Sequence, residues 1–275
     1  NGPTMCEYSQ GEGLMYNNFI SNHYDNVGIT VPATANWTMV FGPWALYFNS
    51  DSTADAAWQD AQNQSVAENT AWPYTWLTNP AYATAAQRAT VTGHLTITDP
   101  LRPNVSAAGA WVGLAAPESA TENAPDNWQF QSDRYQYWVQ ADANGNFTIP
   151  GVCVTDTYGQ PANYTLYAYS AGTSADTGAV GEYSNNLGTF TANQTTNLGN
   201  LTWTVPHQGA SIVWQIGIPD RTAAEYRHGD EYAKPDRWGK FTNEFTNPLE
   251  YNVADNNWAT ALNYVHSVDN VGASP

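Results

Sequence analysis

The chain has 275 residues, of which 25 are acidic and 8 are basic, so its formal net charge is −17 and its pI is about 4.3. This charge excludes electrostatic binding of nucleic acid and docking on membranes through basic patches, because both need clustered Lys and Arg. Hydrophobic residues make up 42% of the chain, enough for packed cores, and no apolar run approaches the roughly 20 residues that span a bilayer. The length predicts two or three domains of roughly 100 to 200 residues each.

The first residues, Asn1-Gly-Pro-Thr-Met, contain neither an initiator Met nor the basic and apolar regions of a signal peptide. We therefore expect a processed chain or a fragment. The chain also contains seven Asn-x-Ser/Thr sequons, a density that predicts a secreted, extracellular glycoprotein. They are Asn36, Asn63, Asn104, Asn146, Asn163, Asn193 and Asn200.

The two cysteines, Cys6 and Cys153, lie in what we interpret as different domains. A disulfide between them is one alternative. The others are that Cys6 pairs with a cysteine outside this chain and that Cys153 is a buried thiol.

Along the first 50 residues, apolar and aromatic runs bounded by Gly, Pro and Asn predict strands at residues 13–22 and 37–49. The next segment is rich in Ala and starts with capping residues, so we predict a helix over 52–64. A second short helix is predicted near 79–88, where Pro80 suits a first helical position.

From residue 89 the pattern is that of short strands separated by turn clusters, which predicts one antiparallel immunoglobulin-like sandwich over 89–205. We expect Asp142-Ala-Asn-Gly-Asn to close a hairpin between two of these strands. The strands are predicted at 90–98, 110–115, 135–142, 146–150, 164–169 and 198–205, and the core at Trp111, Tyr137, Phe147, Leu166 and Trp203. After a linker at 206–209, residues from 211 onward predict a third β unit that residue 275 leaves incomplete.

Motifs for nucleotide, zinc and esterase sites do not occur in the sequence, which contains no Gly-x-Gly-x-x-Gly, Walker loop, His-Glu-x-x-His, Cys-x-x-Cys or Gly-x-Ser-x-Gly. Three ordered groups of residues instead resemble the rhamnogalacturonan lyases of polysaccharide lyase family 4. The first group is Phe41-Gly-Pro-Trp-Ala-Leu-Tyr-Phe-Asn, Asp55-Ala-Ala-Trp-Gln-Asp-Ala and Trp72-Pro-Tyr-Thr-Trp-Leu. The second runs from Val91-Thr-Gly-His-Leu through Tyr135-Gln-Tyr-Trp-Val-Gln-Ala-Asp-Ala-Asn-Gly-Asn-Phe to Gly181-Glu-Tyr-Ser, and the third is Trp214-Gln-Ile-Gly-Ile-Pro-Asp-Arg-Thr-Ala-Ala-Glu-Tyr.

The resemblance implies an all-β chain of three parts. Residues 1–88 would be the tail of a large catalytic β-sandwich with a short helical insertion. Residues 89–205 would be a fibronectin III-like sandwich, and 206–275 the beginning of a jelly roll like those of carbohydrate-binding modules. On this pattern the chain lacks most of the catalytic domain.

The resemblance also implies cleavage of rhamnogalacturonan I by β-elimination at galacturonate, without a required cofactor. Removing the C5 proton needs a cation that neutralises the adjacent carboxylate and a base. The resemblance to family 4 implies that Lys and His fill these two roles. The only lysines here, however, are Lys234 and Lys240, and residues 1–88 contain none. We therefore transfer no catalytic Lys, expect the catalytic His upstream of Asn1, and expect the chain to be inactive without the missing catalytic half.

Four residues of the first segment are candidates for contact with substrate. His23 follows a predicted strand in a polar stretch, where it could border a cleft as a base or be a structural histidine. Tyr16, Tyr24 and Trp44 could stack on sugar rings or fill the sandwich core. In the middle segment, Trp138 would serve as a glycan platform only if it is exposed.

The densest ionic cluster covers residues 220–232, where Asp220, Glu225 and Asp230, with Glu231, could bind a structural Ca²⁺. Arg221 or Arg227 could bind a uronate carboxylate. The alternative is a loop whose charges pair with one another. His94, His207 and His266 stand apart from acidic residues in the sequence, and we interpret them as structural.

These features favour part of a secreted rhamnogalacturonan lyase whose partner is rhamnogalacturonan or another acidic polysaccharide. One rival is a non-catalytic carbohydrate-binding or adhesion protein, which exposed aromatics with a Ca²⁺ site would favour. The other is a structural glycoprotein assembled through strand edges, which an intermolecular sheet without a pocket would favour.

Overall fold

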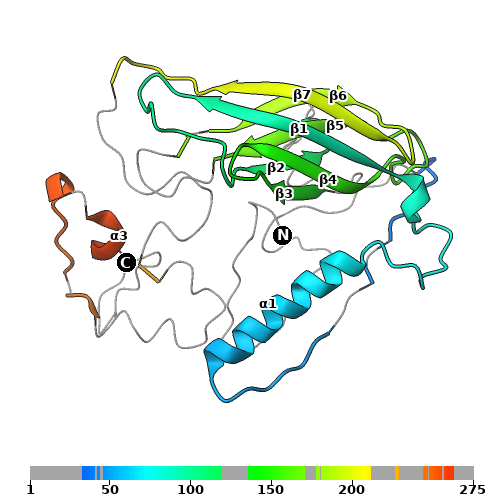
Figure 1. The fold of residues 1–275 in the computed structure, drawn as a ribbon, viewed down its shortest axis with the longest axis horizontal. Coiled ribbons are helices and arrows are strands. Elements are labelled where there is room, and N and C mark those ends of the chain that lie inside the picture. The colour runs from blue at the N-terminus through cyan, green and yellow to red at the C-terminus, as the bar shows by residue number, and fades with distance from the viewer. Residues whose placement is uncertain are drawn as a thin grey trace.

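The structure, a computed structural model of the chain, describes residues 33–40, 42–43, 46–118, 136–170, 178–179, 181–211, 227–228, 244–246, 248–255 and 257–262. The predicted strand at 13–22 and the third β unit from 212 onward lie outside these residues, apart from short pieces near the C-terminal end. Figure 1 shows two sheets with helix α1 beside them, its C-terminal end nearest to the strands.

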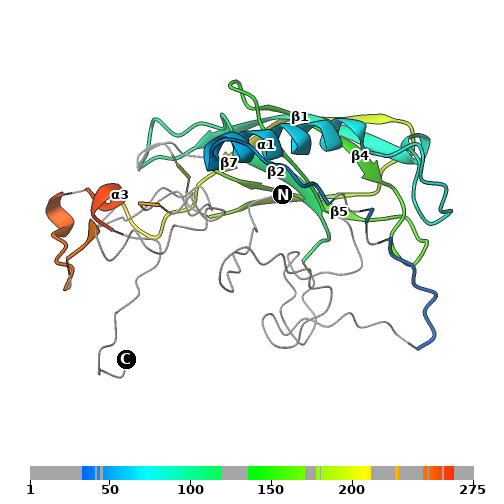
Figure 2. The same ribbon diagram turned by 90° about the horizontal axis from the view of Figure 1, so that it is seen from below.

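Helix α1 covers Ala54–Ala71 and confirms the prediction of a helix in this segment, with seven further residues at its C-terminal end. It begins where the Thr53 side chain accepts a hydrogen bond from the N–H of Ala56, at 3.1 Å. It ends at Trp72, because Pro73 disfavours helical backbone in the residue before it. None of its residues is fully buried, so α1 is a surface helix, and Figure 2 views the molecule with α1 in front of the strands.

The second predicted helix is reduced to one turn of 3-10 helix, η1, at Ala85–Gln87. Thr84 and Gln87 bond to each other at its start, since the Gln87 side-chain oxygen accepts from both the backbone N–H and the hydroxyl of Thr84. Strand β1 begins at the next residue, so the segment has no room for an α-helix.

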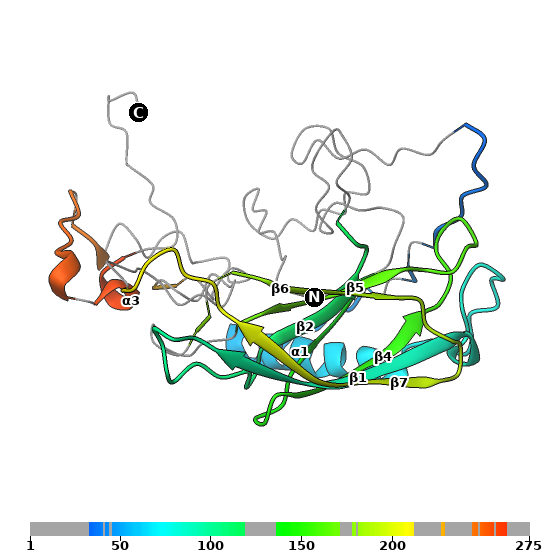
Figure 3. The same cartoon turned by 90° about the horizontal axis from the view of Figure 1, so that it is seen from above.

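The described residues form seven strands in two sheets, which lie as two layers in Figure 3. One sheet has the order β4-β1-β7 and the other has the order β3-β2-β5-β6. The strands are β1 Arg88–Thr98, β2 Trp111–Ala115, β3 Tyr137–Gln140, β4 Asn146–Cys153, β5 Tyr164–Tyr169, β6 Tyr183–Gly188 and β7 Thr195–Thr204. The predicted all-β sandwich is thereby confirmed.

The core lies between the two sheets and is built by alternation along the strands. In β1, Val91, Leu95 and Ile97 are buried while Thr96 and Thr98 face solvent. Of the five residues predicted for the core, Phe147, Leu166 and Trp203 are buried. Trp111 and Tyr137 are only half-buried, since Trp111 packs with an aromatic cluster on the outer face of the second sheet and Tyr137 faces a cavity.

The prediction that the sandwich is purely antiparallel is wrong at β1 and β7. These strands, the first and last of the sandwich, pair in parallel from Thr90 opposite Thr195 to Thr98 opposite Thr204. Parallel strands need a long connection. Here the connection from β1 to β7 consists of β2 to β6, which belong to both sheets.

The expected hairpin at 142–146 is also wrong, although the turn itself is present. The Asp142 side chain accepts hydrogen bonds from the N–H groups of Asn144 and Asn146 and closes the turn. The flanking strands, β3 and β4, belong to different sheets. A local turn signal fixes the reversal of the chain but not the strand that each arm pairs with.

The described part of 37–49 contains no strand, contrary to prediction. A strand needs neighbours for its backbone N–H and C=O groups, and the one bond found from this segment to the sandwich backbone is that of the Thr38 N–H to the Thr157 carbonyl, at 2.7 Å. Leu46 and Phe48 are exposed by 59% and 81%.

Near the C-terminal end the structure has two further short helices, η5 Val253–Asp255 and α3 Trp258–Ala261. No described helix is long and apolar enough to cross a membrane.

Candidate functional site

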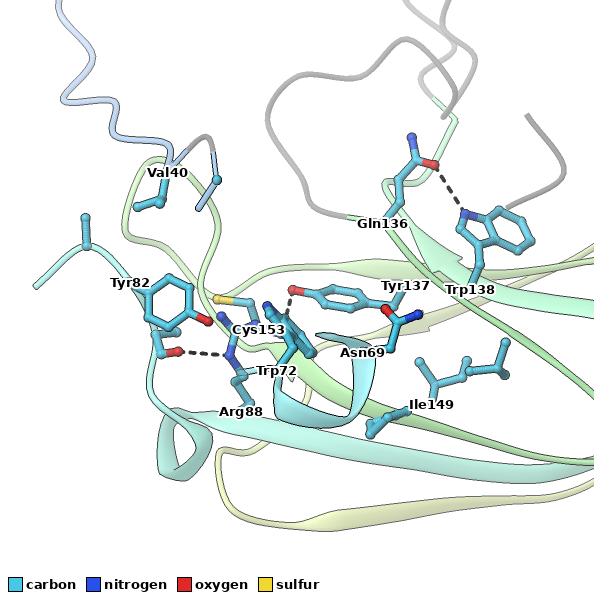
Figure 4. A pocket seen from close by; sticks show the side chains of 15 residues that line it. Val40, Asn69, Trp72, Tyr82, Arg88, Gln136, Tyr137, Trp138, Ile149 and Cys153 are labelled. Carbon is cyan, nitrogen blue, oxygen red and sulfur yellow. Dashed lines mark hydrogen bonds between the residues drawn. The ribbon is translucent and has the colours of Figure 1, made fainter. Parts of the chain in front are cut away.

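A cavity of about 520 Å³ lies where the end of α1, the segment before η1 and strands β3 and β4 meet. This volume is within the usual range for small-molecule sites, roughly 300 to 1,000 Å³. Figure 4 shows aromatic side chains around it, with Trp72, Tyr82 and Tyr137 near Arg88 and with Trp138 and Gln136 further along.

Arg88, the first residue of β1, supplies the positive charge of this cavity. Its Nε donates to the carbonyl of Ala83 at 2.9 Å and its Nη1 donates to the carbonyl of Gly151 at 2.9 Å. Its guanidinium carbon lies 4.5 Å from the ring centre of Trp72 and 5.4 Å from that of Tyr82. Arg88 is only 8% exposed, so backbone carbonyls and aromatic rings hold a nearly buried cation at the cavity wall.

Gly151 makes this arrangement possible through a β-bulge. The register of β1 against β4 shifts so that Pro150 and Gly151 oppose one residue of β1, and Gly151 has a φ of 68°. A Cβ atom at Gly151 would lie 2.3 Å from the Trp72 ring. Only glycine both adopts this backbone without strain and leaves room for the indole.

Tyr82 and Glu68 show how the surrounding groups are engaged. The Tyr82 hydroxyl accepts from the N–H of Tyr74 at 2.9 Å, which fixes its ring beside Arg88. The Tyr74 hydroxyl donates to Glu68, and this bond raises the pKa of Tyr74. Glu68 also accepts from Gln64, so the acidic group nearest in sequence to Trp72 is bonded to neutral donors.

The electrostatics of the cavity differ from those of the chain as a whole. Among the described residues that line it there is neither Asp nor Glu, although the chain has 25 acidic residues, and Arg88 is the single charged residue of this described lining. Across the described residues, Arg88 forms no ion pair and its Nη2 has no hydrogen-bond partner. The cavity is therefore suited to an anionic group, which Arg88 can bind through its remaining donors.

Cys153 lies between Arg88 and Tyr137 and its thiol is buried and free. The backbone N–H of Cys153 donates to the Tyr137 hydroxyl at 3.0 Å, and its carbonyl accepts from the Tyr164 hydroxyl at 2.7 Å. Of the alternatives for Cys153, the structure therefore shows the buried thiol. Cys6 lies outside the described residues.

Trp138 is half-buried and is not an exposed platform. Its ring covers Gly113 and lies 5.8 Å from the ring of Tyr169, while Tyr137 and Val139 pack toward the core. Tyr137 and Val139 thus lie on the core side of β3 and Trp138 lies on the other side.

The residues selected from sequence as site candidates fall outside the described part of the chain. This holds for His23, Tyr16, Tyr24 and Trp44 and for the Ca²⁺ candidates Asp220, Glu225 and Asp230. Within the described ranges, no cluster of three or more His, Cys, Asp or Glu side chains could hold a metal ion.

Arg227 and its neighbour are engaged within the C-terminal segment. The Nε of Arg227 lies 3.0 Å from a carboxylate oxygen of Glu244, and His228 contacts the same oxygen at 2.7 Å. Arg227 also lies over the ring of Phe245, at 5.3 Å. Glu244 and Phe245 lie outside residues 220–232, so these contacts are not the pairing within the cluster that was expected, and the role of Arg227 in binding a uronate stays a prediction.

The interpretation that His207 stands apart from acidic residues is wrong. Its Nε2 lies 2.6 Å from an oxygen of Asp99, whose side chain is fully buried, and the other oxygen of Asp99 lies 3.8 Å from Arg102. The two partners are 108 positions apart, so the sequence around His207 gives no sign of the contact.

All seven sequon asparagines are exposed, as a bulky glycan requires. Asn146 and Asn200 lie on either side of His94, on strands β4 and β7. Their occupancy stays a prediction.

The fold and the cavity can be compared with known proteins. Residues 107–198 match the sequence model of a domain described as polysaccharide lyase family 4, domain II. The match begins before β2 and ends within β7, so Gly151 and Tyr137 of the cavity lie inside the matched residues, whereas Trp72 and Arg88 precede them.

Similarity to curated proteins extends over nearly all of the chain. A probable rhamnogalacturonate lyase C of Emericella nidulans is 27% identical over 93% of this chain and 23% of its own. A rhamnogalacturonate lyase of Dickeya dadantii is 25% identical over 83% of this chain and 36% of its own. A probable rhamnogalacturonate lyase B of Aspergillus niger is 25% identical over 93% of this chain and 35% of its own. The chain thus spans between a quarter and just over a third of the length of these relatives.

Solved structures give weaker similarity. A 9R-lipoxygenase from Cyanothece matches 50% of this chain and 20% of its own at 14% identity, with a TM-score of 0.27. This score is too low to support any inference.

Proposed function

We propose that this chain is part of a secreted rhamnogalacturonan lyase that cleaves the backbone of rhamnogalacturonan I by β-elimination at galacturonate. The observation that carries the proposal is the alignment of 93% of the chain with proteins named rhamnogalacturonate lyases, together with the family 4 match at 107–198. Either finding alone would fit a shared sandwich fold.

The chemistry of the reaction explains why the chain itself is proposed to be inactive. The C5 proton of galacturonate becomes acidic when a cation neutralises the adjacent carboxylate, and a base then removes it. Lys234 and Lys240 are the only lysines, and both follow the matched residues. We propose that the base and the neutralising cation belong to the part of the parent enzyme that this chain does not cover.

The test is an absorbance assay on rhamnogalacturonan, because elimination forms a conjugated 4,5-unsaturated uronate that absorbs in the ultraviolet. We expect absorbance to rise with the complete parent enzyme and not with residues 1–275. General acid–base catalysis alone contributes about 10² to 10⁴-fold, so the difference is large. Elimination by residues 1–275 that is abolished in His23→Ala would instead identify His23 as the base.

Secretion through a glycosylating pathway is part of the proposal, and the exposure of the seven sequon asparagines supports it. We expect N-acetylglucosamine on some of them in material from the native source. Mass spectrometry that finds every sequon unoccupied would contradict it. Structural Ca²⁺ at Asp220, Glu225 and Asp230 stays a prediction that metal analysis of the same material can test.

A further inference from the structure

We propose that the cavity at the start of β1 binds the carboxylate of a uronate sugar through Arg88. The identity of the sugar rests on the proposed function, whereas the preference for a carboxylate rests on the structure. The site would hold the polysaccharide chain beside the sandwich.

The charge of the cavity is the first argument. Removing a cation from water is unfavourable unless an anion or hydrogen-bond acceptors replace the water. Arg88 is only 8% exposed. Across the described residues it contacts two carbonyl oxygens and two aromatic rings but no anionic group. A carboxylate entering the cavity would supply the missing opposite charge without displacing an acidic side chain of the described lining, which contains none.

The donor geometry is the second argument. A guanidinium has five N–H donors in one plane, and Arg88 uses one on Nε and one on Nη1. Its contacts with the faces of Trp72 and Tyr82 use no N–H donor. The second N–H of Nη1 and both N–H groups of Nη2 can therefore form the paired bonds that carboxylates make with arginine.

The remaining lining suits a sugar ring rather than a small ion. Trp72 and Tyr137 present apolar ring surface, and their ring centres are 6.4 Å apart. Asn69, from the last turn of α1, borders the same cavity, and its side-chain amide has no hydrogen-bond partner among the described residues. An amide at the rim can bond to sugar hydroxyls while Arg88 binds the carboxylate.

The binding test compares three probes on the unmodified chain 1–275 by isothermal titration calorimetry at low salt. Trigalacturonate should bind, and its fully methyl-esterified form should bind about tenfold more weakly or worse, since it lacks the charge-assisted bonds. Sodium acetate, which has the carboxylate but no ring, should also bind more weakly. Equal binding of the acid and the ester, or no binding of the acid, would overturn the proposal.

The location is tested on the same unmodified chain by nuclear magnetic resonance. Titration with trigalacturonate should shift the Arg88 Nε–H and Trp72 indole N–H resonances and leave the Arg102 Nε–H resonance in place. Binding that shifts other resonances and neither of the first two would place the sugar elsewhere and overturn the site.

Variants then separate binding from structure. Arg88→Lys keeps the charge but loses the planar fork, and we expect trigalacturonate affinity to fall about tenfold. The matched control is Arg102→Lys, because Arg102 is also buried but is paired with Asp99, and it should retain the affinity of the unmodified chain. Equal affinities of all three chains would contradict the role of Arg88, and if Arg88→Lys does not fold, the resonance shifts decide.

The outcomes distinguish this inference from the proposed function. If residues 1–275 bind the acid selectively but the parent enzyme is inactive, the carboxylate site is supported and the lyase function is contradicted. If the parent enzyme is active but residues 1–275 show no acid-selective binding, the lyase function is supported and the site is contradicted.

Discussion

Two buried arginines lie at opposite ends of strand β1 and are held in different ways. Arg88 is the first residue of the strand and contacts carbonyl oxygens and aromatic rings. Arg102 follows the other end and lies beside Asp99, which also contacts His207. Near Arg102 the opposite charge comes from the chain itself, whereas at Arg88 no carboxylate of the described residues supplies it.

The difference teaches what a buried charge implies in this fold. The Asp99 carboxylate joins the loop after β1 to the segment that follows β7, so this cluster fixes structure. The Arg88 end leaves donors unused beside a cavity. The charge of Arg102 is thus balanced by an acidic side chain of the protein, whereas we propose that a ligand balances the charge of Arg88.

The largest effect is expected at Asp99. Asp99→Asn keeps the shape of the side chain but removes the negative charge beside Arg102, and breaking a buried ion pair in this way costs about 3 to 5 kcal/mol. Urea-induced unfolding should show this loss in the free energy of unfolding. The matched control is Asp60→Asn at a partly exposed carboxylate on α1 that accepts hydrogen bonds from the neutral side chains of Tyr47 and Asn49, which should change the midpoint much less. Similar effects of the two variants would contradict the contrast.

Gly151→Ala should be next in size and acts on the Arg88 cavity. The new methyl group would meet the Trp72 ring in a backbone with φ of 68°, and the sum of strain and overpacking is about 2 to 5 kcal/mol. Gly159→Ala is the control, because Gly159 has φ of 74° but no atom within 4 Å of the added Cβ. It should lose only about 1 to 2 kcal/mol, and a larger loss there than at Gly151 would refute the packing argument.

Arg88→Met is expected to destabilise the fold by about 1 to 3 kcal/mol, through lost hydrogen bonds and cation–π contacts. No partner carboxylate is left without its cation. Arg102→Met does leave Asp99 buried beside a neutral side chain and should therefore be more destabilising. Chemical denaturation of the two variants measures the difference directly, and the reverse order would show that Arg88 is primarily structural.

The smallest effect concerns Tyr167, whose buried hydroxyl is hydrogen-bonded within the protein. Its hydroxyl donates to the carbonyl of Ala116 at 2.9 Å, and burial raises the pKa of Tyr167 to about 12. The unfolded chain ionises this phenol near its ordinary pKa of 10.0. Its contribution to stability is therefore present below pH 10 and is lost as the pH rises through about 12.

Spectrophotometric titration of the folded chain and of Tyr167→Phe measures this difference. The variant should lack one tyrosine that ionises at the high end of the titration. Loss of a tyrosine that ionises near pH 10 would show that Tyr167 is accessible to solvent.

Strand positions could be predicted from sequence because their signal is local. Six of the seven strands coincide with predicted ones, but β6 was not predicted, since Tyr183-Ser-Asn-Asn-Leu-Gly lacks regular alternation of apolar and polar residues. It is a strand because β5 supplies its hydrogen-bond partners. Pairing is not local, which is why the parallel arrangement of β1 with β7 and the crossing at 142–146 were missed.

The candidate cavity could not be predicted because its parts come from separate segments. Trp72 follows α1, Tyr82 precedes η1, and Gly151 lies in β4, so only the fold brings them to Arg88. One signal was present in the sequence. Arg88 is the single Lys or Arg among residues 1–88. A lone basic residue in so acidic a segment is a candidate for a specific structural or binding role.

The parallel pairing of β1 and β7 has a mechanical consequence. The chain enters the sandwich at Arg88 and leaves it at Thr204, at opposite ends of neighbouring strands. At about 3.3 Å per residue, the eleven residues of β1 separate these points by roughly 35 Å. Tension between the flanking segments would load the β1–β7 hydrogen bonds in shear, so that they resist together instead of opening one after another like a zip.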